Sequence, residues 1–386
     1  MEITLKIEAL YWFSALILLY IYAGYPLLLL LSAVIFRKPL STVEITQDLS
    51  LIITAHNEEA VIRKKLENCL ALDYPKDKLE IIVVSDHSDD RTDEIISDFA
   101  DSGITLLRTG SRIGKTGAQN KAVLQTGGKI LVFSDANSLW ESNALKRLIA
   151  PFTDPLVGYV CGRLKYINTG EGASSFSEGL YWRYEIFLRK LESATGATTA
   201  GNGAIYAVRA EDYFNFNDNQ SHDFEFPRYL NSRLKKAVYV HEAIAYEKAG
   251  ATTGDEFKRK VRMLARVWGS ILKTPGVLSP FQNKFSFTWK FISHRLLRYL
   301  APLPLALIFA LNIFLYLAGP GYQILLIAQI AFYSLALTGA VHQLKSRVFY
   351  IPLYFCLFHF ASVAGLVKAL FNSAPAYWEK VGSTRT

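Results

Sequence analysis

Two short acidic motifs are the first residues in the chain whose types and spacing suit a chemical task. They are SDHSDD at 85–90 and SDAN at 134–137, and each follows a short apolar run. Their carboxylate and amide oxygens are hard ligands, which Mg²⁺ or Mn²⁺ prefers, often together with substrate phosphates. A metal held there would neutralise the charge on a departing nucleotide diphosphate. The alternative is that these residues only cap helices and form turns, which is the role expected for Asp89, Asp90 and Thr92.

The elements that must position these motifs alternate between strands and helices. Apolar runs predict strands at 49–55, 79–84, 104–107 and 129–133, and helical spacing predicts helices at about 58–70, 93–99 and 117–124. Such alternation indicates a parallel sheet with helices on both faces. In such a sheet the ligand crevice lies outside the carboxyl ends of the strands. We therefore expect Asn57, Glu58, Asp86 and Asp135 to gather there.

The segments on either side of this part are apolar and almost uncharged. The run at 10–36 carries no charge and exceeds the roughly 20 residues that a bilayer core needs. A basic pair follows this run, so we expect an uncleaved transmembrane helix, with Pro26 as the point where it would kink. Three further crossings are expected at 300–317, 323–341 and 349–371. Basic residues near helix ends mark the cytoplasmic side, which puts the soluble part in the cytosol.

These patterns divide the chain into five parts. They are an N-terminal transmembrane helix at 1–38, a soluble domain at 39–275, an interfacial basic segment at 276–298, about three transmembrane helices at 299–372, and a tail at 373–386.

Composition excludes several classes of protein. The chain has 386 residues, with 51% hydrophobic and 20% charged residues, which does not fit a disordered chain, a collagen or a coiled coil. The net charge of +8 suits contact with anionic membrane lipids, and no basic run interleaved with aromatics points to nucleic acid. The 3 cysteines have no metal-binding spacing, so neither a disulfide framework nor structural zinc is expected.

Four motifs in order resemble those of the membrane-bound glycosyltransferase family 2. They are AHNE at 55–58, VVSDHS at 83–88, RIGKTGAQN at 112–120 and FSDAN at 133–137. That family includes cellulose, chitin and hyaluronan synthases and bacterial polysaccharide glycosyltransferases, and the resemblance covers about 49–268. It implies an α/β chain with the GT-A nucleotide-sugar-binding fold, a mostly parallel sheet and flanking transmembrane helices.

The resemblance also implies a donor site and a metal site. The residues that it assigns to the nucleotide sugar in these motifs are Ala55, Asn57, Glu58, Asp86, Lys115 and Asp135. Many members have Asp-x-Asp where this chain has Asp135 and Asn137. An amide oxygen can still coordinate Mg²⁺ or Mn²⁺, but it adds no charge.

Two later motifs would serve the acceptor. GNGAIYAVR at 201–209 resembles the acceptor strand of the family, in which Gly201, Asn202 and Gly203 permit a close backbone approach; a simple hairpin turn is the alternative. SHDFE at 221–225 resembles the motif that carries the general base. Asp223 fits that role, because an inverting transfer needs a carboxylate to take the acceptor's proton. Glu225 is the second candidate, and a helix cap through Arg233 is the alternative for Asp223.

The segment FKRKVRM at 257–263 matches a Gln-x-x-Arg-Trp motif only in part. Arg259 and Arg262 lie three residues apart, and a guanidinium fork suits a leaving diphosphate. Met263 stands where processive members have the tryptophan that contacts the acceptor. The alternative is a basic helix beside the membrane, and both roles can coexist. The partial match favours a single transfer over long polymerisation.

Two further expectations concern His222 and an apparent phosphate-binding loop. His222 stands where the family usually has an acidic residue; it is expected to be a solvated loop histidine, and the alternative is that it tunes the base. GSRIGKT at 110–116 has three residues between its glycines, whereas the nucleotide-triphosphatase loop needs four, so we do not expect an ATPase.

The sequence therefore predicts an inverting glycosyltransferase that moves a sugar, expected to be UDP-linked, to a lipid, a lipid-linked glycan or a polysaccharide. The alternative is a non-catalytic, membrane-anchored nucleotide-sugar-binding subunit of a polysaccharide synthase, and a transporter is a third, weaker reading. The expected location is a bacterial cell (inner) membrane with the catalytic domain in the cytosol. Partner proteins of polysaccharide assembly are a further expectation.

Overall fold

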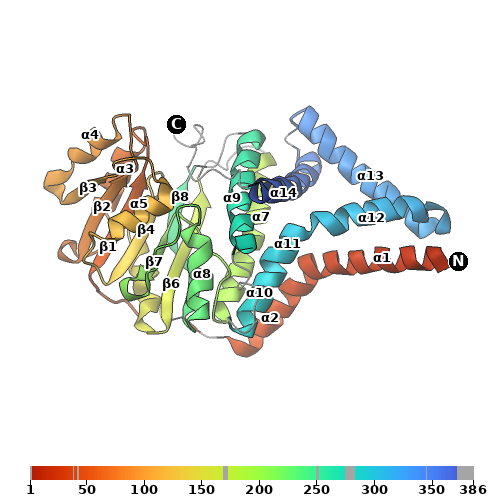
Figure 1. Ribbon diagram of the computed structural model, residues 1–386, viewed down its shortest axis with the longest axis horizontal. Coiled ribbons are helices and arrows are strands. Elements are labelled where there is room, and N and C mark those ends of the chain that lie inside the picture. Colours follow the sequence, from red (N-terminus) through yellow and green to blue (C-terminus); the bar gives the residue numbers. More distant parts are fainter. Residues whose placement is uncertain are drawn as a thin grey trace.

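The computed structural model contains a sheet-based part and a bundle of long apolar helices that lie side by side (Figure 1). It describes residues 2–37, 39–40, 43–167, 173–248, 252–273, 283–344 and 346–371. The predicted tail at 373–386 and residues 276–282 of the predicted interfacial segment lie outside these ranges. The five-part division of the chain therefore stays a prediction.

An eight-stranded mixed sheet forms the soluble part, in the order β3-β2-β1-β4-β7-β6-β8-β5. The strands are β1 Leu49–Ala55, β2 Leu79–Ser85, β3 Ile104–Arg108, β4 Ile130–Asp135, β5 Leu139–Trp140, β6 Val157–Tyr166, β7 Tyr206–Arg209 and β8 Lys236–Glu247. The first four strands in the order pair in parallel, as the sequence predicts. Strand β7 then joins β4 and β6 in antiparallel fashion, while β6 and β8 are parallel. The expected α/β fold class is confirmed.

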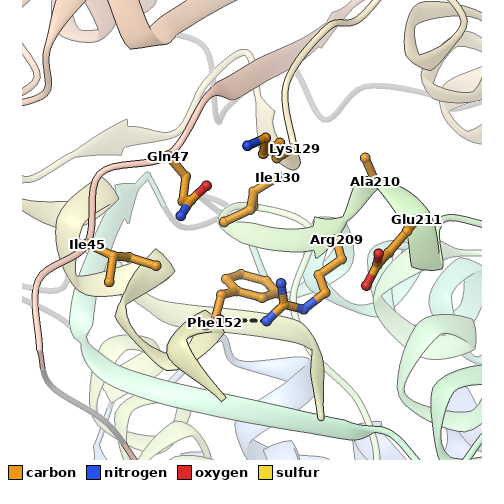
Figure 2. Close-up of a pocket in the computed structure, with 8 residues that line it drawn as sticks. All are labelled: Ile45, Gln47, Lys129, Ile130, Phe152, Arg209, Ala210 and Glu211. Carbon is orange, nitrogen blue, oxygen red and sulfur yellow. Dashed lines mark hydrogen bonds between the residues drawn. The ribbon is translucent and has the colours of Figure 1, made fainter. Parts of the chain in front are cut away.

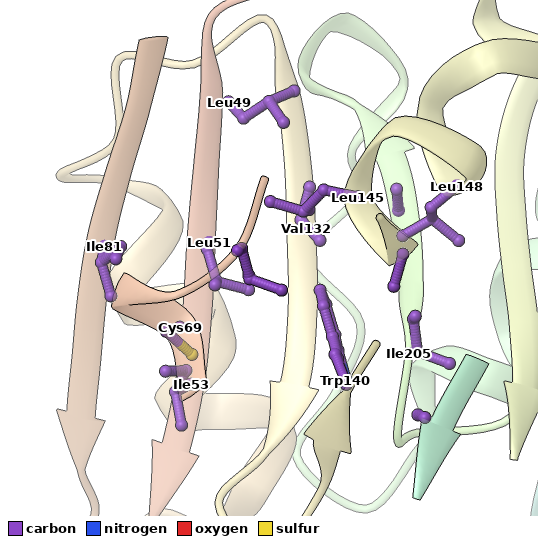
Figure 3. Close-up of a cluster of buried hydrophobic side chains, with 14 of the residues drawn as sticks. Leu49, Leu51, Ile53, Cys69, Ile81, Val132, Trp140, Leu145, Leu148 and Ile205 are labelled. Carbon is purple, nitrogen blue, oxygen red and sulfur yellow. The ribbon is translucent and has the colours of Figure 1, made fainter. Parts of the chain in front are cut away.

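Burial on both faces explains the apolar runs of the central strands. All seven residues of β1 are buried. One face packs on α3 (Ile62–Leu70), α4 (Thr92–Ser97) and α6 (Ala144–Ile149), through Leu51, Val132 and Trp140 among others (Figure 3). The other face packs on α5 (Gly114–Val123) and α8 (His222–Ser232). Burial of each large apolar side chain contributes about 1.5–3 kcal/mol, so these faces hold the strand ends in place.

Three helices in the described part of the chain are long and apolar enough to cross a membrane. They are Glu2–Phe36, Pro320–Val341 (α13) and Arg347–Leu370 (α14). A bent pair, Phe285–Leu300 with Pro302–Ala318, would make a fourth; its halves meet at 49°. This pair comprises α10 (Phe285–Lys290), a π-helical turn Phe291–Leu296, α11 (Leu297–Leu300), α12 (Pro302–Leu315) and a short 3₁₀ turn Tyr316–Ala318.

The N-terminal helix begins at Glu2, ahead of the uncharged run at 10–36, and it contains α1 (Glu2–Leu19) and α2 (Tyr25–Phe36). A π-helical turn, Tyr20–Gly24, separates the two, just before Pro26. Proline lacks an N–H and cannot complete the regular hydrogen-bond ladder, and a wider turn before it accommodates that loss.

Helices α7 (Ala173–Ala194) and α9 (Thr253–Lys273) stand between the sheet and the apolar bundle (Figure 1). Helix α14 packs closely along α9 at Gly365. A Cβ atom at position 365 would lie 2.9 Å from Cβ of Leu264 and 3.0 Å from the backbone nitrogen of Ala265. The soluble part is thus fixed against the apolar helices by α9 and α7.

Candidate active site

A cavity of about 330 Å³ opens at the carboxyl end of β4, between the sheet and helices α7, α8 and α9. Nine of the residues predicted for the site line it: Lys115, Asp135, Asn137, Gly201, Gly203, Asp223, Arg259, Arg262 and Met263. Ala55, Asn57, Glu58, Asp86 and Asn202 do not line this cavity. The structure therefore brings together residues from motifs that are spread over some 150 positions of the chain.

Asp135 and Lys115 form an ion pair in the wall of the cavity. Asp135 ends β4, Lys115 lies in the first turn of α5, and its Nζ donates to Oδ1 of Asp135. Both side chains are about one-fifth exposed, at 20% and 19%. Gly203 faces this pair, since a Cβ atom there would lie 2.7 Å from Nζ of Lys115 and 3.4 Å from Oδ2 of Asp135. The absence of a side chain at 203 leaves the pair accessible.

Asp86 fixes the loop that carries Lys115. Its carboxylate accepts hydrogen bonds of 2.8 Å from the backbone N–H groups of both Ile113 and Gly114, and Oγ1 of Thr109 lies 3.3 Å away. The side chain is buried and sits at the N-terminus of α5, where a negative charge is favoured. The hydrogen bonds that Asp86 makes are those of a helix cap, which is the alternative considered for it in the sequence. Contact with a nucleotide base stays a prediction.

The loops after β1 and β2 are tied to each other by hydrogen bonds. Asn57 has a positive φ of 53°, and its Oδ1 accepts a 2.8 Å hydrogen bond from the backbone N–H of Asp89. Its own N–H donates to Oγ of Ser88 at 3.0 Å. Ala55 and Glu58 are fully buried. A donor role for these three predicted residues remains a prediction.

Asp223 enters the cavity from the first turn of α8. Its carboxylate accepts a hydrogen bond from Oγ of Ser221, the residue before the helix. Its backbone carbonyl accepts a 2.7 Å bond from the N–H of Gly201, which ties the predicted acceptor segment to the predicted base. Arg233, the proposed capping partner, instead stacks 4.7 Å from the ring centroid of Tyr229.

Glu225, the second candidate base, is engaged elsewhere. Its carboxylate is fully buried, pairs with Arg228 and accepts a hydrogen bond from Ser270 of α9. These bonds fasten α8 to α9, so Asp223 is the carboxylate in this motif that suits proton transfer.

His222 is not solvated, contrary to the expectation. It is 3% exposed, its Nδ1 lies 2.9 Å from the hydroxyl of Tyr206, and its ring meets Phe133 and Phe226 edge to face. Burial, helped by the charge of Lys115, lowers the pKa of His222 to about 3. The imidazole is therefore neutral. The prediction failed because Phe133 of β4 and Tyr206 of β7, both distant in the chain, join the nearby ring of Phe226 in covering it.

The backbone around Asn202 is a packed segment and not an open hairpin turn. Nδ2 of Asn202 donates a 2.7 Å bond to the carbonyl of Gly162, and Oδ1 accepts from the N–H groups of Ala204 and Ile205 at 3.2 Å. Gly201 packs on Tyr159, because a Cβ atom at 201 would overlap the tyrosine hydroxyl. The close approach expected of this glycine is thus an approach to the protein's own core.

The predicted guanidinium fork of Arg259 is held by Glu256. Nε and Nη2 donate to the two carboxylate oxygens at 2.8 Å each, and Nη1 donates to the hydroxyl of Tyr166 at 3.1 Å. Arg262 and the half-exposed Met263 lie on the same helix, which also packs along α14. Helix α9 therefore lines the cavity and contacts the apolar bundle, so the two readings of this segment coexist.

A second cavity, of about 320 Å³, lies at the other end of β4 and shows no comparable chemistry (Figure 2). Its arginine, Arg209, donates to the backbone carbonyls of Phe152, Asp154 and Val157. These bonds are structural. Ligands of such sheets bind at the carboxyl ends of strands, and this cavity lies at the amino end of β4.

A family model described as Glycosyl transferase family 2 matches residues 50–216. Residues 50–216 are a glycosyl transferase family 2 domain. The match includes Lys115, Asp135 and the glycine segment, while Asp223 and α9 follow it in the chain.

Curated relatives are similar to parts of this chain. The chain is 37% identical over 128 residues to the probable glycosyltransferase YdaM of Bacillus subtilis, covering 32% of this chain and 30% of that protein. It is 30% identical over 168 residues to the beta-monoglucosyldiacylglycerol synthase of Synechocystis sp., covering 42% and 35%. It is also 24% identical over 273 residues to the poly-beta-1,6-N-acetyl-D-glucosamine synthase of Staphylococcus aureus, covering 66% of each chain. The match spans about a third of the length of the first two relatives.

A solved structure shares the fold over nearly the whole chain. It is the mannosyltransferase PcManGT from Pyrobaculum calidifontis, in complex with GDP-Man and Mn²⁺. The TM-score is 0.73 at 21% sequence identity, and the alignment covers 94% of this chain and 99% of that one. The shared fold therefore includes both the sheet-based part and the apolar helices of this chain.

A metal in this family 2 domain would need ligands from the substrate. Among the described residues, no group of three or more His, Cys, Asp or Glu side chains could hold a metal ion. Asp135 and Asn137 offer one carboxylate and one amide to the cavity. That donor set fits Mg²⁺ or Mn²⁺ when the diphosphate of a donor completes the coordination.

Several residues of the cavity lie outside every motif found in the sequence. Helix α7 contributes Trp182, Glu185 and Arg189, and the π-helical turn contributes Arg295. Eight basic side chains line the cavity against five carboxylates: the basic ones are Lys115, Arg189, Lys248, Arg259, Lys260, Arg262, Arg266 and Arg295. This excess suits an anionic ligand. No prediction from the sequence covers α7, and no motif in the sequence of this helix marks a site.

Proposed function

We propose that this chain is a membrane-bound inverting glycosyltransferase that moves a sugar from a nucleotide-diphospho sugar, expected to be UDP-linked, to a lipid, a lipid-linked glycan or a polysaccharide. One observation carries the proposal. The carboxylate of Asp223 and the Lys115–Asp135 pair line one cavity whose basic side chains outnumber its acidic ones. The names of the relatives support it, and so does the shared fold of a mannosyltransferase solved with GDP-Man and Mn²⁺.

Each end of the cavity would have its own task. Asp135 and Asn137 would hold Mg²⁺ or Mn²⁺ together with the donor diphosphate, and the metal would neutralise charge on the leaving group. Lys115 would pair with the diphosphate once Asp135 binds the metal. Asp223 would take the proton of the acceptor hydroxyl as its oxygen attacks the anomeric carbon in line. The bond to the nucleoside diphosphate breaks as the new glycosidic bond forms.

The apolar helices support a position at the membrane. Tyr299 of α11 and Phe358 of α14 line the cavity, so an acceptor held in the membrane would reach Asp223 without leaving the bilayer surface. The basic residues near the helix ends support a cavity on the cytosolic side, and the membrane that we propose is a bacterial inner membrane. Arg259 is already held by Glu256, and Met263 replaces an aromatic residue, which favours a single transfer.

The test is nucleotide release by detergent-purified protein. A panel of UDP-sugars and GDP-mannose is offered with Mn²⁺ or Mg²⁺ and a membrane lipid extract. We expect one donor to turn over, EDTA to stop turnover, and Asp223→Asn to lower the rate by about 10²–10⁴ while donor binding is kept. The matched control is Asp101→Asn, an exposed aspartate far from the cavity.

Two results would contradict the proposal. If donors bind with metal but none turns over with any acceptor fraction, the non-catalytic binding subunit is the better reading. If Asp223→Asn keeps full activity, Asp223 is not the base.

A further inference from the structure

Arg189 is a buried arginine that the structure leaves without a polar partner. It lies on α7 in the wall of the cavity and is 7% exposed. Among the described residues it has no hydrogen bond and no ion pair, and its Nε is completely buried. Its guanidinium carbon lies 6.0 Å from the ring centroid of Trp182, which is a weak cation–π contact.

Two neighbouring buried arginines differ from Arg189, because each pairs with a carboxylate even though one of its nitrogens, Nη2 of Arg295 or Nε of Arg298, has no hydrogen-bond partner in the described part of the chain. Nη1 of Arg295 lies 2.9 Å from Oε1 of Glu185, and Nη1 of Arg298 lies 2.8 Å from Oε2 of the same carboxylate. A buried guanidinium is stable only when anions or hydrogen-bond acceptors compensate its lost hydration. The described residues supply no anion and no hydrogen-bond acceptor to Arg189, and its side chain borders the cavity. We therefore expect a ligand in the cavity to supply the hydrogen-bond acceptor.

Arg189 lines the same cavity as the predicted base, Asp223. Gly203 faces the Lys115–Asp135 pair, whereas Gly201 faces Tyr159 on the other side of the segment. Burial raises the pKa of the neighbouring Cys161 thiol to about 12, and the charges of Arg189 and Asp223 both act on that thiol. A Cβ atom at Gly201 would lie 3.2 Å from Cβ of Cys161, so Arg189 and Asp223, which line one cavity, both act on its Gly201 side.

We propose that Arg189 binds an oxyanion, phosphate or carboxylate, that belongs to the acceptor and lies beside the hydroxyl that Asp223 deprotonates. The inference rests on the proposed function and narrows its acceptor to an anionic molecule. The planar fork of a guanidinium matches both phosphate and carboxylate oxygens. The rings of Tyr166 and Trp182, 5.6 Å apart, border the same wall and offer apolar faces beside the anion site.

The test compares Arg189→Gln and Arg189→Lys with Lys190→Gln, which alters an exposed neighbour on the same helix. Transfer is measured to three acceptors: diacylglycerol and phosphatidic acid, each in phosphatidylcholine vesicles, and a glucuronate-bearing oligosaccharide. We expect an anionic acceptor to be preferred by the unaltered protein. Arg189→Gln should raise the KM for the anionic acceptor by about tenfold or more, and Arg189→Lys should raise it less. The KM for the donor should stay within about twofold of that of the unaltered protein in both variants. Lys190→Gln should change neither.

The three acceptors distinguish a lipid phosphate from a sugar carboxylate as the source of the anion. Preference for phosphatidic acid assigns a lipid phosphate, and preference for the oligosaccharide assigns a carboxylate. A rise in the donor KM in Arg189→Gln would overturn the proposal, since the arginine would then serve the donor diphosphate. Equal use of diacylglycerol by the variant and the unaltered protein, with no anionic preference, would overturn it too.

A binding measurement covers the case in which the proposed function itself fails. Inorganic phosphate and glucuronate are titrated against the melting temperature of each folded variant, without donor or metal. We expect half-maximal stabilisation of Arg189→Gln to need about tenfold more anion than that of Lys190→Gln. Identical titrations would overturn the anion site, whatever the enzymatic result.

Discussion

Nδ1 of His294 lies 2.6 Å from Oε1 of Glu192, and both side chains are buried between the sheet and the apolar helices. The other ring nitrogen of His294 lies 3.2 Å from Glu185, which also pairs with Arg295 and Arg298. The imidazole is thus held between two carboxylates of α7. A buried ionic cluster of this kind is stable only while every member keeps its partners.

One carboxylate of this cluster joins four segments of the chain. Glu192 of α7 contacts His294 of the π-helical turn and accepts a 2.8 Å hydrogen bond from the hydroxyl of Tyr25 in the N-terminal apolar helix. It also accepts a 2.9 Å bond from the backbone N–H of Thr199, two residues before Gly201. The segment that lines the cavity is therefore tied to the candidate membrane helices through Glu192.

Replacement of Glu192 should destabilise the protein in a pH-dependent way. Burial opposes ionisation of Glu192, but His294 and Arg295 outweigh it and lower its pKa to about 2. A carboxyl group whose pKa is lower in the folded state than in the unfolded state stabilises the fold fully above pH 4.5, the unfolded value. That stabilisation is lost as the pH falls toward 2. We expect Glu192→Gln to cost about 3–5 kcal/mol at pH 7, seen as a lower melting temperature in detergent. The gap to the unaltered protein should narrow below pH 4.5. A loss no larger than that of the exposed Glu242→Gln would contradict this account.

The first half of the sheet and its strand ends could be predicted from the sequence. Local patterns sufficed there because each central strand is buried on both faces and reads as a short apolar run. The position of Asp135 follows directly, since it ends β4. The strand register then aligns the carboxyl ends of the three strands, because Thr54 of β1 pairs with Asp135 of β4 and Ala55 pairs with Ser85 of β2.

The rest of the cavity depends on contacts between distant segments, which no local pattern encodes. His222 was expected in solvent, yet rings from β4 and β7 meet it, together with Phe226 of its own helix. Arg189 and Glu185 lie on one helix and differ in role only because Arg295 and Arg298 meet Glu185 and leave Arg189 without a described partner. The engagement of Arg259 by Glu256 was within reach, since the two are three residues apart on one helix.

Alanine at the two glycines of the acceptor segment should have different effects. A Cβ atom at Gly201 would overlap the hydroxyl of the fully buried Tyr159, so Gly201→Ala should cost about 1–3 kcal/mol of stability. A Cβ atom at Gly203 meets only the flexible end of Lys115, so Gly203→Ala should lower activity with little change in melting temperature. Thermal melts and nucleotide release of both variants check this. Tyr159→Phe combined with Gly201→Ala should recover part of the lost stability. If it recovers none, a contact other than the Tyr159 hydroxyl causes the destabilisation by Gly201→Ala.

The buried, neutral state of His222 predicts how stability changes between pH 7 and pH 4. Burial, and then the charge of Lys115, lowers its folded pKa from 6.5 to about 3. A depressed histidine pKa gives stability that is complete above the unfolded pKa and falls as the unfolded state takes up a proton. We expect a loss from this group of about 1.4 kcal/mol per pH unit below 6.5. His222→Gln can still bond Tyr206 but does not titrate, so its melting temperature should fall less steeply with pH than that of the unaltered protein. The exposed His87→Asn should keep the original slope. If His222→Gln keeps it as well, another group governs the acid sensitivity.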